Sequence, residues 1–291
     1  MKVLVTGGAG RVGMFVVREL IARGHEVTAA GRTPDRQIEG ARYVTLDCTD
    51  LEAVRRVVRE HESVIHLAAI PYPRRGASCQ IFEINCLGTY HVYEACAEAG
   101  IRKIAVASSI NALGMFFGVK PLPVRYFPID EEHPQLCSDP YSFSKKTTEE
   151  IGEFFWHKNG ISSVSIRIPY VVDPRGKKRL EPMRDKDPTD FALVRNYWTW
   201  VDARDSARAF AMGIDAPYEG AHVLFVNDSV NCMGRPSREL AAMCYPEVTD
   251  WREPIEGNEA LVSCRRAREV IGWEPQFSAG DDSFQPNGAE R

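Results

Sequence analysis

The stretch Thr6-Gly7-Gly8-Ala9-Gly10-Arg11-Val12-Gly13 stands between a short β-branched run and a segment whose apolar residues have helical spacing. The run Val3 to Thr6 predicts a strand, and residues 11 to 23 predict a helix. Glycines at such a turn let the backbone bend sharply and approach a pyrophosphate, whose charge meets the free N–H groups of the helix start. The stretch therefore predicts a dinucleotide site in a βαβ unit, although glycines can also serve a tight turn alone.

Strand and helix patterns alternate along the rest of the chain. Further strands are predicted at Val27 to Ala30, Tyr43 to Leu46, Val64 to Leu67, Ile104 to Ala107, Val164 to Ile168 and Val223 to Val226, and helices at about 50–60, 80–99, 140–158 and 203–215. Helices of this length can cross over between parallel strands in the right-handed sense. The alternation therefore predicts an α/β protein with a Rossmann-like, doubly wound parallel sheet.

Two stretches interrupt the alternation, residues 111–139 and 170–200, and both are rich in Pro, Gly and charge. Long loops at the carboxyl ends of parallel strands lie over the ligand crevice, so these stretches are candidate walls of a substrate site. We expect a dinucleotide-binding core over residues 1–169 that includes the substrate loop 111–139. Residues 170–291 would add a later core strand at about 223–226, a substrate loop and a C-terminal cap, which makes the substrate-binding lobe small and discontinuous.

The composition excludes several classes of protein. Of 291 residues, 44% are apolar and 26% are charged, which excludes a disordered, collagen-like or coiled-coil chain. The charge sum of 36 basic and 40 acidic residues is −4, so we expect no nucleic acid or membrane partner. No apolar run reaches the roughly 18 residues of a membrane span and no secretory signal is visible, which favours a cytoplasmic protein. Eight cysteines without Cys-x-x-Cys spacing and seven unclustered histidines predict no metal site.

The identity of the dinucleotide depends on the end of the second strand, where an acidic residue would bind the adenosine ribose. This strand ends Ala29-Ala30-Gly31-Arg32. Because a carboxylate is missing and Arg32, with Arg11, could clamp a 2′-phosphate, NADP fits better than NAD, which stays possible. Arg32 could alternatively point into water. Asp47 is placed to accept a hydrogen bond from the adenine amino group, or to cap the helix near Asp50.

A second motif, Tyr141-Ser142-Phe143-Ser144-Lys145, puts a phenol and an ammonium group on one face of a helix. A tyrosine with a pKa near 10 is only about one part in a thousand ionised at neutral pH, and a nearby cation lowers that pKa. The phenolate could then take a hydroxyl proton while a hydride leaves the same carbon. Ser109 follows the strand Ile104 to Ala107 and can reach the same crevice. We therefore expect Ser109, Tyr141 and Lys145 to be catalytic.

Other short motifs follow one another along the chain. They are His66-Leu67-Ala68-Ala69, Asn85-Cys86-Leu87-Gly88-Thr89, Arg167-Ile168-Pro169, Trp200-Val201-Asp202 with Asp205, and Ile271-Gly272-Trp273-Glu274-Pro275-Gln276. With the glycine turn, Ser109 and the Tyr-Lys pair, they make residues 1–275 resemble the extended short-chain dehydrogenase/reductase superfamily. Within it the chain resembles the NAD(P)-dependent epimerase/dehydratase family, and uronate and related aldose dehydrogenases most of all.

The resemblance implies a role for each matching residue. Tyr141 would be the general base or acid, Ser109 would polarise the substrate oxygen, and Lys145 would hold the nicotinamide ribose and keep the pKa of Tyr141 low. The implied cofactor-binding residues are Gly7, Gly10, Arg11, Val12, Gly13, Arg32, Asp47, Leu67, Ala68, Ala69, Tyr141, Lys145 and Pro169. Asn85 would be structural. The helices at 80–99 and 140–158 resemble those that pair in relatives, which implies a homodimer.

For the substrate, the resemblance implies contacts with Ser109, Asn111, Tyr170 and Arg179. Arg179 belongs to a basic run that could grip a carboxylate or simply be solvated. The expected function is an oxidoreductase that transfers a hydride between the nicotinamide and a sugar-like or uronate-like carbon of a small polyhydroxylated or sugar-acid substrate. One alternative is a nucleotide-sugar epimerase with a tightly held cofactor, and another is a non-catalytic protein that senses NADP(H).

Overall fold

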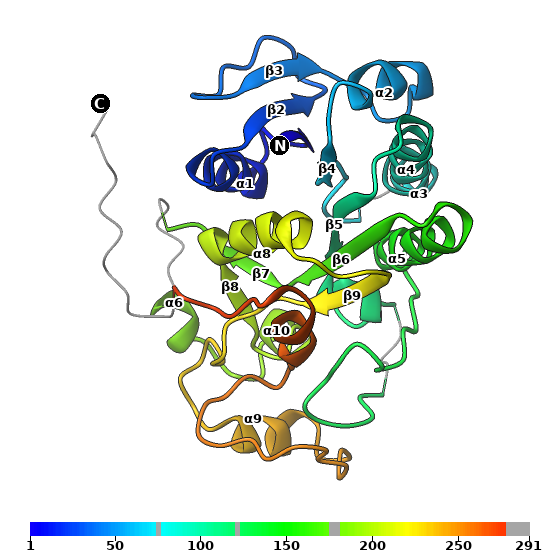
Figure 1. The fold of residues 1–291 in the computed structure, drawn as a ribbon. Coiled ribbons are helices and arrows are strands. Elements are labelled where there is room, and N and C mark those ends of the chain that lie inside the picture. The colour runs from blue at the N-terminus through cyan, green and yellow to red at the C-terminus, as the bar shows by residue number, and fades with distance from the viewer. Residues whose placement is uncertain (74–76, 120–122, 175–180, 278–291) are drawn as a thin grey trace.

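A computed structural model describes residues 1–73, 77–119, 123–174 and 181–277. In this part of the chain, seven parallel strands form one sheet in the order β3-β2-β1-β4-β5-β6-β9 (Figure 1). The strands are β1 (Lys2–Thr6), β2 (Glu26–Gly31), β3 (Arg42–Thr45), β4 (Ser63–His66), β5 (Lys103–Ser109), β6 (Ser162–Ile168) and β9 (Ala221–Phe225). The order reverses between β1 and β4, which is where a doubly wound sheet binds its ligand. The predicted Rossmann-like α/β fold is confirmed.

Helices cover both faces of this sheet. They are α1 (Arg11–Ala22), α2 (Leu51–Val58), α3 (Ser78–Phe82), a π-helix (Glu83–Leu87), α4 (Gly88–Ala99), a 3-10 turn (Ile110–Leu113), α5 (Pro140–Asn159) and α8 (Ala203–Asp215). One apolar cluster buries α1 and α8 against the sheet, and another buries α2, α4 and α5. The helix predicted at 80–99 is interrupted by the π-helix. Helix α5 begins where its sequence indicates, because Asp139 accepts the Ser142 N–H at 2.8 Å and Pro140 takes the first position.

A smaller lobe lies at the carboxyl side of the sheet. Its elements are β7 (Tyr170–Val172), α6 (Glu181–Arg184), α7 (Phe191–Val194), β8 (Trp200–Asp202) and α9 (Ser237–Cys244), whereas α10 (Arg265–Ile271) packs on α8 and β9 of the main sheet. A separate apolar cluster joins side chains from the loop 110–129 to others between 193 and 262, so the lobe is discontinuous in sequence. The stretch 170–200, expected to be a loop, contains two short helices and the parallel pair β7 and β8. The division at residue 169 stays a prediction.

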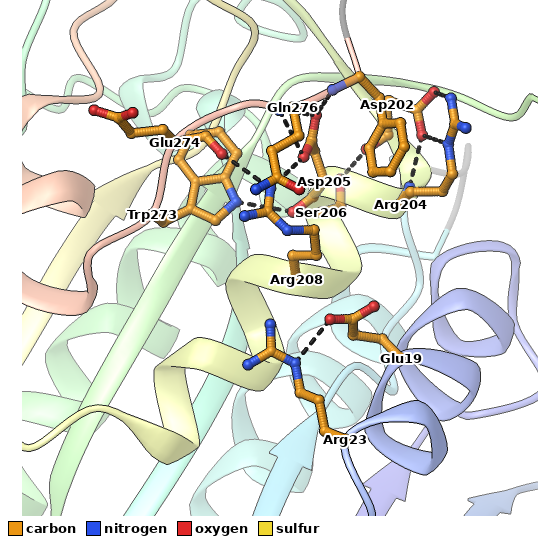
Figure 2. Close-up of polar contacts among 11 residues, drawn as sticks. Glu19, Arg23, Asp202, Arg204, Asp205, Ser206, Arg208, Trp273, Glu274 and Gln276 are labelled. Atoms are coloured by element: carbon orange, nitrogen blue, oxygen red, sulfur yellow. Dashed lines mark hydrogen bonds and ion pairs between the residues drawn. The ribbon is translucent and has the colours of Figure 1, made fainter. Parts of the chain in front are cut away.

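Hydrogen bonds hold the C-terminal segment against the start of α8 (Figure 2). The buried carboxylate of Asp205 accepts the backbone N–H of Gln276 at 3.0 Å and that of Phe277 at 2.8 Å, and pairs with Arg208 at 2.7 Å. The indole of Trp273 donates to the Asp205 carbonyl at 3.0 Å. Helix α8 packs on α1, so these contacts stabilise the helix that follows the glycine turn.

Two absences concern the described residues alone. None of their helices combines the length and apolar character needed to cross a membrane. Nor do their His, Cys, Asp and Glu side chains form a group of three that could hold a metal ion. All eight cysteines are free thiols.

Candidate active site

The glycine turn between β1 and α1 is shaped by backbone contacts that side chains would prevent. Gly7 has a φ of 70°, and a Cβ there would lie 2.8 Å from the backbone nitrogen of Ala68. A Cβ on Gly13 would overlap the Gly7 carbonyl oxygen. Gly10 begins α1 without a side-chain cap, and the first turn of the helix carries no acidic residue. The helix start therefore presents N–H groups and a positive dipole end, which fit the diphosphate of a dinucleotide.

The residues predicted to contact adenosine, Arg32 and Asp47, follow β2 and β3 and are exposed. Asp47 accepts the backbone N–H of Thr49 at 2.9 Å and its hydroxyl at 2.8 Å. The backbone bond to Thr49 is the main cause that lowers the pKa of Asp47, and the charge of Arg32 adds to it. The cap of α2 is Asp50, which accepts the Ala53 N–H at 3.0 Å, so Asp47 does not cap that helix. Arg32 forms no ion pair within the described chain.

The segment after β4 is held behind the glycine turn. His66 is buried, and its ring nitrogens lie 2.7 Å from the Thr6 hydroxyl and 3.2 Å from the Thr89 hydroxyl. Burial lowers the pKa of His66 to about 3, so the ring is neutral. Asn85 in the π-helix accepts the Ile70 N–H at 2.8 Å. These contacts fix the backbone that carries Leu67, Ala68 and Ala69 beside Gly7.

Ser109 ends β5, and Tyr141 and Lys145 lie one turn apart at the start of α5. All three are no more than 6% exposed. The Nζ of Lys145 donates to the Ala107 carbonyl at 2.6 Å and lies 6.0 Å from the centre of the Tyr141 ring. The Ser109 hydroxyl oxygen accepts the Asn111 backbone N–H at 3.1 Å and its side-chain amide at 3.2 Å. The structure thus brings together the residues that the sequence predicts to be catalytic.

The protonation of this group differs from the expectation. Burial raises the pKa of Tyr141 to about 12, and a hydrogen bond with Ser109 opposes the rise. Burial also lowers the pKa of Lys145 to about 8, against the opposing influence of Cys86 and Glu149. The prediction that Lys145 holds the pKa of Tyr141 low is therefore wrong for this structure. The desolvation of a buried phenol dominates its pKa, and the group that acidifies it is Ser109.

A buried network behind the site was missed by the sequence analysis. Glu149, one turn beyond Lys145, accepts the Ser108 hydroxyl at 2.5 Å and the Gln135 amide at 2.7 Å. It also forms a two-pronged ion pair with Arg167 of β6, with both distances 2.8 Å. The network therefore joins β5, β6, α5 and the 111–139 loop directly behind the predicted catalytic residues. The spacing of Lys145 and Glu149 on one helix face was the available signal.

Of the other residues predicted to bind cofactor or substrate, only some lie near Ser109. Asn111 lies beside Ser109, and its buried Oδ1 has no hydrogen-bond partner among the described residues. Pro169 joins β6 to β7, and Tyr170 begins β7 with its side chain against the apolar cluster of the lobe. Arg179 and the rest of its basic run lie outside the described residues.

Two curated proteins that the chain is similar to are sugar dehydrogenases. The L-arabinose 1-dehydrogenase (NAD(P)(+)) of Haloferax volcanii is 31% identical over 202 residues, which covers 68% of this chain and 76% of that protein. The uronate dehydrogenase of Pseudomonas putida is 25% identical and covers 97% of this chain and 92% of that protein.

A solved structure extends the likeness to the fold. The UDP-glucose 4-epimerase of Thermotoga maritima matches with a TM-score of 0.69 at 23% identity, over 96% of this chain and 94% of that one. Residues 3–231 match the NAD dependent epimerase/dehydratase family. With its glycine cradle and its Ser-Tyr-Lys group on a doubly wound sheet, the chain belongs to the NAD-dependent epimerase/dehydratase family of enzymes.

Proposed function

We propose that this enzyme is a sugar dehydrogenase that transfers a hydride between a nicotinamide and a hydroxyl or carbonyl carbon of a small sugar or sugar acid. One observation carries the proposal: Ser109, Tyr141 and Lys145 are buried together at the carboxyl end of β5, and the glycine turn follows the carboxyl end of the parallel strand β1 at the same edge of the sheet. The similarity to an arabinose and a uronate dehydrogenase supports a sugar-like substrate.

In the proposed reaction each side chain has one task. Ser109 accepts both Asn111 donors, which leaves its single hydroxyl hydrogen to be donated to Tyr141 and, when a substrate is bound, to the reacting oxygen. Tyr141 exchanges the hydroxyl proton with the substrate. Lys145 has two N–H groups left after its bond to Ala107, and we expect them to hold ribose hydroxyls. A bound nicotinamide supplies the hydride chemistry.

We further propose that NADP is the preferred cofactor, with NAD accepted. Gly7, Gly10 and Gly13 would hold the diphosphate in either case. The exposed guanidinium groups of Arg11 and Arg32 lie after the strands that border the adenosine site, and neither forms an ion pair within the described residues. Both are therefore available to a 2′-phosphate. The arabinose dehydrogenase whose name includes NAD(P) is consistent with this preference.

The test is turnover of hydroxylated sugars, followed through the absorbance of the reduced nicotinamide. We expect Tyr141→Phe to lower kcat by roughly a thousandfold, since general acid-base catalysis contributes about 10²–10⁴. Cofactor affinity should stay unchanged. The matched control is Tyr218→Phe. Tyr218 lies before β9, the strand at one edge of the sheet, and its hydroxyl donates to the Gly213 carbonyl.

The alternatives give different results in the same assay. An epimerase would purify with its cofactor and show no net reduction of added NADP. A protein that only senses NADP(H) would bind the cofactor without turnover, and Tyr141→Phe would leave its behaviour unchanged. Either result contradicts the dehydrogenase proposal.

We also infer that α4 and α5 pair with a second copy of the chain. Phe82, Leu87, Phe143 and Phe154 are each 42% to 49% exposed on the face formed by these helices and α3. Phe82 stacks on Phe143 with ring centres 5.9 Å apart, so the apolar area is continuous there. Sedimentation of the wild type should give a dimer, and Phe143→Glu should give a monomer. A wild-type monomer at micromolar concentration contradicts the inference.

A further inference from the structure

Part of the 111–139 loop folds onto the catalytic tyrosine. The Phe117 ring meets the Tyr141 ring edge to face, with centres 5.6 Å apart and planes at 88°. Phe117 is itself partly exposed, whereas Tyr141 is 6% exposed. Phe117 is thus one of the groups that keep water from the phenol ring.

A single arginine from a distant segment holds this part of the loop. The Nη1 of Arg195, the residue after α7, donates to the carbonyl oxygens of Met115 at 3.1 Å, Phe116 at 3.4 Å and Gly118 at 2.9 Å. Its guanidinium lies 4.0 Å from the centre of the Phe191 ring. The two N–H groups of this nitrogen, one of them shared between two carbonyls, fix the backbone on both sides of Phe117.

Two features of the backbone hold these segments in place: a close approach within the loop and a strained turn after α7. Gly118 approaches the Gly114 carbonyl so closely that a Cβ would overlap it. Two buried residues after Arg195, Tyr197 and Trp198, have φ values of 55° and 52°. Bulky residues in the left-handed region are strained and persist where the surroundings require them. Here they turn the chain from Arg195 into β8.

We propose that Phe117, held by Arg195, is a specificity-determining residue that packs against the C–H face of a cyclic sugar whose hydroxyl reacts at Tyr141. The inference rests on the proposed dehydrogenase function. The reacting hydroxyl must come within hydrogen-bond distance of Tyr141, which places the sugar skeleton beside Phe117. A pyranose or furanose ring offers a continuous C–H face to an aromatic ring, and an open-chain alcohol does not.

The experiment compares cyclic sugars with their open-chain alcohols. L-Arabinose, D-glucose and D-glucuronate are assayed with NADP, each beside the corresponding alditol or aldonic acid. For the best cyclic substrate we expect Phe117→Leu to lower kcat/KM roughly tenfold, mainly through KM, because aromatic contacts contribute about 0.5–1.5 kcal/mol beyond area burial. For the corresponding open-chain compound, the same substitution should lower kcat/KM by a smaller factor. Phe117→Tyr should keep the wild-type preference.

Further variants separate this role from folding. Arg195→Lys keeps the charge, but its ammonium ends one bond short of the position of Nη1, and we expect it to shift the preference in the same direction as Phe117→Leu. Arg42→Lys, an exposed arginine that pairs with Glu60 on the far edge of the sheet, is its matched control. NADP affinity and thermal midpoint are measured for every variant.

The outcomes are distinguishable from failure of the proposed function. If the wild type turns over sugars and Phe117→Leu leaves the preference for cyclic substrates unchanged, or lowers both classes equally, Phe117 does not determine specificity while the dehydrogenase function stands. If the wild type turns over no sugar, the proposed function fails and this inference falls with it.

Discussion

The two ends of the active site are built in different ways. The proposed cofactor end is made of backbone, because Gly7 and Gly13 bring the β1–α1 turn against the segment after β4. The substrate end is made of side chains from distant segments, with Phe117 over Tyr141 and Arg195 fastening the loop. A backbone cradle binds any dinucleotide diphosphate, so we infer that selection among substrates depends on the side chains at the other end.

Charge is also used differently at the two ends. Arg32 at the cofactor end is exposed, and its effect on a ligand is screened by water and salt. At the catalytic end Lys145, Glu149 and Arg167 are each no more than 7% exposed. Burial there shifts the pKa of Lys145 down to about 8, so a change in one neighbouring charge affects protonation near physiological pH.

Among the variants that leave Tyr141 in place, the largest effect is expected from Glu149→Gln. The carboxylate of Glu149 raises the pKa of Lys145, so its removal lets that pKa fall further below about 8. If the ammonium form is required, the alkaline limb of the kcat profile moves to lower pH. At pH values above this pKa, each unit by which the pKa of Lys145 falls lowers the protonated fraction of Lys145 roughly tenfold. Arg167 also loses its buried partner, and breaking such a pair costs about 3–5 kcal/mol, so the thermal midpoint should drop.

The control for this variant is Glu153→Gln on the same helix, whose side chain is 70% exposed. We expect it to keep the wild-type pH profile and thermal midpoint. A purely structural role for Glu149 would lower the thermal midpoint and leave the alkaline limb where it is, and that result would contradict an electrostatic link to Lys145.

The sequence predicted what local patterns encode. The glycine turn, the strands and the facing of Tyr141 and Lys145 each depend on neighbours in the chain, and the structure has them as expected. The direction of the Tyr141 pKa shift was wrong, because burial is a property of the folded surroundings that no local motif contains. The strands β7 and β8 have three residues each, too few to show a period.

The contacts that cross the molecule were equally invisible in the sequence. Arg195 holds a loop about eighty residues before it, and its isolated charge gave no reason to single it out. Arg167 was noticed only as part of a motif, although it pairs with Glu149 behind the site. Local sequence patterns therefore predicted the glycine turn and the strands beside it, all within the first 69 residues, better than the side-chain contacts around Tyr141.

The smallest expected effect tests the cofactor end. Arg32→Ala should weaken NADP binding by roughly tenfold, since a hydrogen bond to a charged group contributes about 1.5–3 kcal/mol and this one is exposed. NAD lacks the 2′-phosphate, so its affinity should stay the same, and the NADP loss should shrink as salt is added. Titration of NADPH and NADH fluorescence measures both, with Arg42→Ala as an exposed control. An equal loss for both cofactors would mean that Arg32 contacts the adenosine they share, and no loss for either would mean that its side chain stays in water.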